Sequence, residues 1–424
     1  MMTPEMIECL VRVGPGTPMG NLMRRYWVPA LLSREIPEPD CPPVRVKLLG
    51  ERLLAFRDSE GRPGLVDEFC AHRRASLFLG RNEEGGIRCS YHGWKYDIHG
   101  NCVELPSAPQ IACKVKLKAY PCIERGDIVW AYMGPPGKRP EPPELEWALV
   151  PPEQRYVSKR IQECGWLQSM EGGIDTTHAS WVHRYELDTD PMHKHAPANK
   201  YIKADRNAVF DIVEAEHGLT IFGRRNGEDD SYYYRITQWI FPWFTLIPPF
   251  GPHALGGHMW IPRDDESCWT WNINFFPDKP LPPEELEAMK RGEGIHAKLI
   301  PGTFRPVANR NNDWLIDRQA QREGRLYSGV QGFGMQDSSL QESMGPIQDY
   351  EKEFLVPTDK AIVMTRRALY RAARDLEKGV EPPALSAKSQ RVRAASILLN
   401  RKEKATEWAK AALQDSLSKP VYTV

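Results

Sequence analysis

Short runs of alternating apolar and polar residues fill the first third of the chain and are separated by turn residues. The run VRVKLLGERLLAFR at 44–57 indicates two strands around Gly50-Glu51, and PGLVDEF at 63–69 indicates another. Similar runs continue to Met133. Because this alternation is typical of strands with one buried face, the region is predicted to be antiparallel and β-rich.

A second strand-rich region is expected beyond the Pro-rich stretch 134–147, which is typical of a linker between domains. Residues 207–276 alternate in strand fashion and are dense in aromatic side chains. This pattern predicts a second antiparallel sheet with one covered face.

Three helices are predicted in the same part of the chain. Residues 164–184 and 358–378 have helical periodicity, and Gly379 stands where the second of these helices should end. A last, polar helix is expected over 386–414.

The composition narrows the classes of function. Lys and Arg together number 56, as do Asp and Glu, so the formal net charge is zero and a nucleic-acid partner is not expected. No run of apolar residues is long enough for a membrane span, and the first residues do not resemble a secretory signal, so a cytoplasmic location is expected. Nine cysteines, an odd number, then favour free thiols or metal ligands over disulfides.

Two pairs of metal-binding side chains stand out in the β-rich region, Cys70 with His72 and Cys89 with His92. Zinc accepts two thiolates and two imidazoles, but zinc fingers usually pair like with like in the sequence. Mixed pairs suit a [2Fe–2S] cluster in which one iron binds both thiolates and the other binds both neutral imidazoles. We therefore expect such a cluster, with a structural zinc site as the alternative.

A second set of candidate ligands lies in the expected helix 164–184. Asp175 and His178 are three residues apart and share a helix face. His178 and His183 are five apart and would diverge by roughly 140° on an ideal helix. If both bind one metal, the helix must bulge or end between them. Two histidines and a carboxylate are the ligands of non-heme Fe(II) oxygenases.

The motifs CxHR and CxxHGW, followed later by DxxHxxxxH, resemble those of the alpha subunits of Rieske non-heme iron aromatic ring-hydroxylating oxygenases. The resemblance is strongest to the phthalate dioxygenase-like group, which includes aromatic O-demethylases. It implies an α+β fold, with a β-rich Rieske domain at 40–150 and a helix-grip catalytic domain with a curved antiparallel sheet at 151–380. Residues 1–39 are expected to pack on the catalytic domain, and 381–424 to form a helical tail.

The resemblance also implies the ligands. The [2Fe–2S] cluster is assigned to Cys70, His72, Cys89 and His92, and the mononuclear Fe(II) to His178, His183 and Asp337. Asp349 and Glu342 are the alternatives to Asp337 in the stretch MQDSSLQESMGPIQDY. Asp175 is expected to connect His178 of one chain with a cluster-binding histidine of its neighbour, rather than to bind iron.

In such a system a separate reductase or ferredoxin passes electrons from NAD(P)H to the cluster, and a homotrimer, or two stacked trimers, brings the cluster close to the iron of the next chain. The expected substrates are O₂ and an aromatic carboxylic acid, with O-demethylation of a methoxylated, lignin-derived acid such as dehydrodivanillate favoured. Cis-dihydroxylation of a phthalate-like diacid is the alternative. A purely electron-transferring protein is the second alternative, although it has no use for an open iron site.

The aromatic run 232–250 is expected to line the substrate cavity, or simply to form the core of the sheet. Arg235 lies inside this run, and burying an arginine is costly unless it meets an anion. Arg235 is therefore predicted to bind a substrate carboxylate. Three other cations are alternatives for this role: Lys203, Arg206 and Arg225.

Two further groups have no predicted role in the chemistry. His193 and His195 are expected to be solvated on a loop. Three cysteines and a histidine, namely Cys102, Cys113, Cys122 and His99, are expected to be unmetallated, with a third metal site as the alternative.

Overall fold

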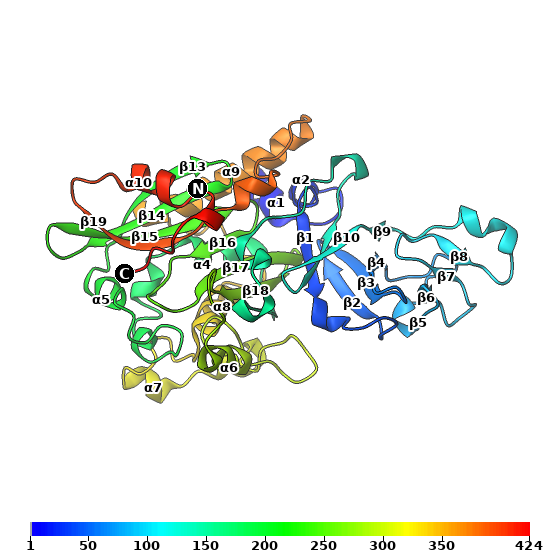
Figure 1. The fold of residues 1–424 in the computed structure, drawn as a ribbon, viewed down its shortest axis with the longest axis horizontal. Coiled ribbons are helices and arrows are strands. Elements are labelled where there is room, and N and C mark those ends of the chain that lie inside the picture. Colours follow the sequence, from blue (N-terminus) through cyan, green and yellow to red (C-terminus); the bar gives the residue numbers. More distant parts are fainter. Residues whose placement is uncertain (1) are drawn as a thin grey trace.

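The computed structural model describes residues 2–424 and shows two lobes (Figure 1). The smaller lobe, blue to cyan in the figure, contains the antiparallel strands expected between residues 44 and 133. Its first sheet has the order β2-β3-β4-β9, with bounds Val44–Leu48, Glu51–Arg57, Pro63–Asp67 and Ala119–Tyr120. Its second sheet has the order β5-β6-β7-β8, with bounds Arg81–Glu83, Gly86–Arg88, Lys95–Tyr96 and Cys102–Glu104. The predicted β-rich region is thus confirmed.

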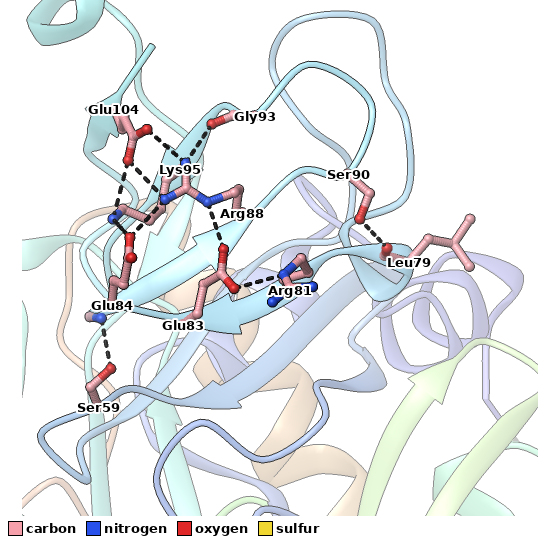
Figure 2. A network of polar contacts seen from close by, with 11 residues as sticks. Ser59, Leu79, Arg81, Glu83, Glu84, Arg88, Ser90, Gly93, Lys95 and Glu104 are labelled. Carbon is pink, nitrogen blue, oxygen red and sulfur yellow. Dashed lines mark hydrogen bonds and ion pairs between the residues drawn. The ribbon is translucent and has the colours of Figure 1, made fainter. Parts of the chain in front are cut away.

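A dense polar network holds the second sheet together (Figure 2). The Arg88 guanidinium donates to Glu83 and Glu104 on strands β5 and β8, and to the Gly93 carbonyl oxygen at 3.2 Å. The salt bridge from Arg88 lowers the pKa of Glu104 to about 2. Because Gly93 follows His92 in the chain, this network supports one of the two loops that carry the candidate cluster ligands.

The chain joins the two lobes through a small sheet and an N-terminal pair of helices. The sheet has the order β1-β11-β10, with bounds Trp27–Leu32, Ile128–Tyr132 and Cys122–Arg125. The helices are α1 (Pro4–Val11) and α2 (Pro18–Met23), whose first turns are capped by the hydroxyls of Thr3 and Thr17. Both helices lie against α9 (Lys360–Glu377) of the larger lobe.

An eight-stranded antiparallel sheet forms the centre of the larger lobe, as the alternation over 207–276 predicts. The strand order is β12-β18-β17-β16-β15-β14-β13, and β19 pairs with β15. The strands have the following bounds: β12 Arg155–Gln162, β13 Val209–Ala215, β14 Gly218–Asn226, β15 Ser231–Ile240, β16 Phe244–Ile247, β17 Leu255–Asp264, β18 Ser267–Phe275 and β19 Ala395–Asn400.

Helix α4 (Trp166–Ile174) lies across this sheet against β16 and β17, with α8 (Phe333–Ser343) beside it. A glycine allows this close approach, because a Cβ at Gly173 would stand 2.4 Å from the Trp260 ring. The remaining helices are α3 Glu146–Leu149, α5 Asn199–Ala204, α6 Pro283–Arg291, α7 Arg318–Arg322 and α10 Ala405–Ala412. No helix among residues 2–424 is both long enough and apolar enough to cross a membrane.

Two helix predictions need correction, while the third is confirmed. Helix α9 matches the prediction over 358–378, and Gly379 adopts a positive φ directly after it. The helix expected over 164–184 ends at Ile174. The helix expected over 386–414 is present only as α10 in its second half, because its first half contains strand β19.

The position of β19 explains this error. Strand β16 pairs with only the last residues of β15, at 238–240, and so leaves the backbone of 231–236 without a neighbour on that edge. Residues 395–400 pair with this open edge, which satisfies its hydrogen-bonding groups. Residues 395–400 are therefore part of the central sheet, and the helix of the tail is confined to α10.

Candidate cluster and iron sites

The two loops that carry the candidate cluster ligands meet in the smaller lobe. Cys70 and His72 follow β4, whereas Cys89 and His92 follow β6. The two thiols are buried and the two imidazoles are exposed. The Nδ1 atoms of the imidazoles lie 3.1 Å apart. Two inner thiols and two outer imidazoles with converging nitrogens fit the ligand set of a [2Fe–2S] cluster with unlike irons.

Neighbouring side chains hold these ligands in place. The Tyr96 hydroxyl lies 3.3 Å from the Cys70 sulfur and accepts a hydrogen bond from the Ala71 N–H. Trp94 stacks on His72, with 4.6 Å between the ring centres. Burial raises the pKa of the Cys70 thiol, more than these hydrogen bonds lower it. The thiolate therefore depends on metal coordination for its stability in this pocket.

The second set of ligands comes together where α4 ends. Asp175 closes the helix, and its carboxylate accepts the backbone N–H groups of Thr177 and His178. The chain then makes a 3₁₀ turn over His178–Ser180, so that the rings of His178 and His183 lie 5.2 Å apart between centres. The distortion that the five-residue spacing requires is present, but it begins before His178 rather than between the two histidines.

Asp337 completes this group from helix α8. Its Oδ1 lies 3.2 Å from His183 Nε2 and 3.6 Å from His178 Nε2. One ligand atom of each of the three residues lies within 4.8 Å of the others. Asp337 stands inside helix α8.

The rival carboxylates lie elsewhere. Asp349 is at the surface in an ion pair with Lys352. Glu342 is buried, but it accepts hydrogen bonds from the Glu163 N–H and from Trp314 Nε1. Neither belongs to the group formed by His178, His183 and Asp337.

The electrostatics of this group suit a bound cation. Burial opposes ionisation of Asp337, but the two imidazoles outweigh it and lower its pKa to about 2. Burial also opposes the charge on His178, whereas Asp175 and Asp337 raise its pKa to about 9. His183 donates from Nδ1 to Gln336 Oε1 at 2.7 Å, which leaves Nε2 for a metal. Two nitrogens and one carboxylate fit Fe(II) and leave coordination positions open.

A cavity of about 100 Å³ opens beside the candidate iron ligands, between α4, α8 and strands β15 to β17. By volume it has room for several water molecules or for a ring-sized ligand. Arg235, from β15, lines this cavity and is 3% exposed. One of its nitrogens donates to the Pro248 carbonyl oxygen at 3.2 Å. Its Nε and Nη1 are enclosed and have no partner among residues 2–424.

The other three cations considered for substrate binding do not line the cavity. Lys203 pairs with Asp188 at the surface, and Arg206 stacks on Trp181. Arg225 donates to the Thr176 carbonyl oxygen and to Asp205, and so braces the segment that carries His178.

Two cavity residues are not predicted from the sequence. Arg160 of β12 lines the cavity and donates to the carbonyl oxygens of Ile295 and Gly334. An arginine at an inward position of an alternating strand is the same signal that marks Arg235. His193 also lines the cavity and is buried, so the expectation that it is solvated is wrong, whereas His195 is exposed as expected.

Three of the cysteines outside the cluster loops differ in their exposure. Cys102 is buried, Cys122 is half-buried and Cys113 is exposed, and all three are free thiols. None of them belongs to a compact group of metal-binding side chains among residues 2–424.

Comparison with known proteins assigns each half of the chain to a described family. Residues 26–121 match the family described as "Rieske [2Fe-2S] domain", and residues 131–421 match the family described as "LigXa C-terminal domain like". The crystal structure of dicamba monooxygenase bound to dicamba superposes with a TM-score of 0.58 at 16% identity, over 85% of this chain and 100% of that one. That similarity concerns the fold alone.

Three curated proteins show higher sequence similarity. The 3-chlorobenzoate-3,4-dioxygenase oxygenase subunit of Comamonas testosteroni is 39% identical over 90% of this chain and 91% of its own length. The tert-butanol monooxygenase / tert-amyl alcohol desaturase oxygenase subunit of Aquincola tertiaricarbonis is 43% identical, over 90% and 78%. The 5,5'-dehydrodivanillate O-demethylase oxygenase subunit of Sphingobium sp. (strain NBRC 103272 / SYK-6) is 31% identical, over 91% and 84%.

These matches extend over the cluster loops, the candidate iron ligands and the catalytic sheet, and they agree with the chemistry of the two donor sets. The chain therefore belongs to the alpha subunits of the Rieske non-heme iron aromatic oxygenases, enzymes that contain a [2Fe–2S] cluster and a mononuclear iron.

Proposed function

We propose that this oxygenase uses O₂ and electrons from a reductase to hydroxylate an aromatic carboxylic acid, which it holds through the carboxylate by Arg235. The incompletely paired guanidinium of Arg235 carries this proposal. Two enclosed N–H donors without partners are costly, at roughly 1–3 kcal/mol each. Arg235 lines the cavity, and a carboxylate bound there would accept hydrogen bonds from this guanidinium.

The preferred reaction is O-demethylation of a methoxylated aromatic acid, as in the name of the 31% identical relative. Bound iron would supply the activation of dioxygen. The protein decides what is attacked, because Arg235 and the cavity walls orient the acid relative to His178, His183 and Asp337. Hydroxylation of a methoxy carbon requires that this carbon points at the three ligands.

Cis-dihydroxylation of a phthalate-like diacid is the second candidate. The 39% identical relative is named as a dioxygenase subunit, which supports cis-dihydroxylation. Arg160 is a second cation that lines the same cavity, but its donors are taken up by Ile295, Gly334 and Ser338. In this case the ring edge rather than a methoxy group faces the iron ligands. The two reactions differ in their products, because only O-demethylation releases formaldehyde.

Replacing Arg235 by glutamine tests the binding of an acid. We expect the Michaelis constant for 4-hydroxy-3-methoxybenzoate or phthalate to rise by about tenfold or more, since a hydrogen bond to a charged group contributes about 1.5–3 kcal/mol. The turnover number should change less than the Michaelis constant. Oxygen uptake with formaldehyde or diol analysis measures both constants.

Lys203→Gln is the matched control, because Lys203 is a cation of the same domain that lies outside the cavity. It should leave both constants unchanged. An unchanged Michaelis constant in Arg235→Gln would disprove carboxylate binding at this residue. The alcohol named for the 43% identical relative has no carboxylate, so turnover of such alcohols without acids would contradict the proposal as well.

We propose further that electrons pass between neighbouring chains. The small lobe with the candidate cluster ligands projects away from α4 and α8 within one chain (Figure 1). Phe78, Leu79 and Tyr91 are exposed on the small lobe near the cluster imidazoles. A second exposed group lies on the large lobe next to the segment that carries His178 and His183: Trp181, Tyr185 and Tyr327. Contact between these two apolar surfaces of adjacent subunits would generate a closed ring such as a trimer.

In this arrangement Asp175 is the connecting residue. Its Oδ2 lies 3.3 Å from His178 Nδ1, and its carboxylate is partly exposed. It can therefore contact a cluster-binding imidazole of the next subunit. Asp175→Asn should slow steady-state turnover by about 10–100-fold while iron and sulfide contents stay at wild-type values.

The direct readout for Asp175→Asn is the reoxidation rate of the reduced cluster when substrate and O₂ are added. Asp188→Asn, a surface aspartate on the following turn, serves as the control. Unchanged cluster reoxidation in Asp175→Asn would remove this residue from the path. Mixed oligomers of Cys89→Ser and Asp337→Ala chains add a second test, because activity returns only if electrons cross between chains.

A further inference from the structure

His193 is a buried side chain of the cavity for which the oxygenase chemistry described above has no use. It is 7% exposed and belongs to the same cavity as Arg235. One face of its ring stacks on Phe333, with 4.0 Å between ring centres and 12° between planes. Phe250 meets the ring edge-on at 4.7 Å. These two aromatic contacts hold the imidazole in one orientation.

A carboxylate fixes the proton on this imidazole. His193 Nδ1 lies 2.7 Å from Asp190 Oδ1. The Asp190 carboxylate also accepts the backbone N–H groups of Met192 at 2.9 Å and Gly294 at 3.1 Å. Burial opposes ionisation of Asp190, but His193 and these N–H groups lower its pKa overall. An ionised carboxylate only accepts hydrogen bonds, so the proton of the neutral ring stays on Nδ1.

The other nitrogen is then an unused acceptor. Burial lowers the pKa of His193 below its ordinary value, so the ring is neutral and Nε2 bears a lone pair. The ring makes its hydrogen bond through Nδ1, and no partner for Nε2 occurs among residues 2–424. Nε2 is not fully enclosed by protein atoms. It is therefore open to the cavity that His193 lines.

The acceptor lies close to the proposed anion site. The Arg235 guanidinium carbon lies 4.0 Å from the centre of the Phe250 ring, and that ring also contacts His193. The cavity wall thus presents donors at Arg235 and an acceptor at His193 next to a single phenyl ring. A ligand that satisfies both carries an anionic group and, a short distance away, a hydrogen-bond donor.

We propose that His193, oriented by Asp190, accepts a hydrogen bond from a ring hydroxyl of the substrate, and that the enzyme therefore selects hydroxylated aromatic acids. This inference rests on the proposed function, because it assumes that an aromatic acid occupies the cavity. A phenolic hydroxyl is a donor at neutral pH, whereas a methoxy group or a hydrogen atom at the same position leaves Nε2 unsatisfied.

Equilibrium binding to the holoenzyme without O₂ tests the proposal with three acids that differ at one ring position. These are 4-hydroxy-3-methoxybenzoate, 3,4-dimethoxybenzoate and 3-methoxybenzoate. The wild-type protein should bind the hydroxylated acid about tenfold more tightly than either of the others, as expected for one buried hydrogen bond. Equal affinities for the three acids would overturn the proposal without any variant.

Variants then locate the acceptor. His193→Phe keeps a ring for stacking on Phe333 but has no acceptor, so the preference should fall to about one. His193→Gln retains an acceptor and should restore part of the preference. His195→Asn, on the exposed side of the same loop, is the control and should keep the full preference. A tenfold preference that persists in His193→Phe would overturn the proposal.

The design separates this inference from the proposed function. If all three acids bind equally and Arg235→Gln weakens all of them, the role of His193 is wrong and the acid-binding site remains. If none of the acids binds to the wild-type protein, the proposed function fails and this inference fails with it.

Discussion

The Asp337→Ala variant is expected to lose the mononuclear iron and all measurable turnover but to keep its [2Fe–2S] cluster. This is the largest effect that we expect from any single substitution. The Asp337 carboxylate is the only negative ligand within reach of both His178 Nε2 and His183 Nε2 in the described chain. Loss of an outer hydrogen-bonding partner typically costs about 10–100-fold in metal affinity or in activity. Loss of a charged ligand should cost more.

Iron and sulfide analysis measures the result. The wild-type protein should contain about three irons and two acid-labile sulfides per chain, and the variant about two of each. The electron paramagnetic resonance signal of the reduced cluster should be unchanged. Asp349→Ala is the control, because Asp349 is a surface carboxylate of the same region. Retention of the third iron in Asp337→Ala, or its loss in Asp349→Ala, would reverse the assignment.

The second large effect concerns stability and arises at Arg366. This residue of α9 is 2% exposed and donates to the carboxylates of Glu171 on α4 and Glu353. Both carboxylates are themselves buried. Arg366→Met would leave two buried negative charges without a partner, which should cost about 3–5 kcal/mol in the free energy of unfolding. Because α4 leads directly to Asp175 and His178, iron binding should weaken as well.

The pH dependence follows from the sign of the pKa shift at Glu171. Burial raises its pKa above the ordinary value, even with Arg366 present. A carboxyl with a raised pKa in the folded state binds protons more tightly than it does in the unfolded chain. Without Arg366 the pKa rises further, so the stability deficit of Arg366→Met should be largest at neutral pH. It should shrink as the pH falls and Glu171 becomes protonated.

Urea unfolding of the holoenzyme, followed by tryptophan fluorescence at several pH values, measures the stability deficit of Arg366→Met. Arg371→Met is the matched control from the same helix, because Arg371 pairs with Glu214 at the surface, where the two side chains are 61% and 60% exposed. That variant should lose less than about 1 kcal/mol. Equal losses in the free energy of unfolding of the two variants would show that burial of the Arg366 cluster does not determine how much the cluster stabilises the protein.

The sequence by itself determined the features that depend on neighbouring residues. Strand alternation between 44 and 133 and over 207–276 predicts both β-rich regions, because the period of a half-buried strand is local. The pairs around Cys70 and Cys89 are recognisable for the same reason, since each loop supplies its two ligands within four residues. The five-residue spacing of His178 and His183 already requires a break in the helix.

Local patterns could not reveal where that break begins. Helix α4 ends early because the Asp175 carboxylate accepts the next backbone N–H groups, and this capping competes with a helical periodicity that continues to His183. The misassigned strand β19 has a related cause. Residues 395–400 have no strand partner near them in the sequence, and only the open edge of β15 makes their extended conformation favourable.

Tertiary structure alone decided which side chains share the cavity. Asp337 lies more than 150 positions after His183, and the packing of α8 beside α4 brings the two together. Arg235 and Arg225 both lie in neighbouring strands of the central sheet and both keep an enclosed nitrogen without a partner, yet only Arg235 lines the cavity. His193 sits in a loop that resembles a solvated one until Phe333 and Phe250 cover it. The segments that bury and pair these side chains are distant in the chain. A local sequence pattern therefore shows which residue types are present, but not that they come together in one site.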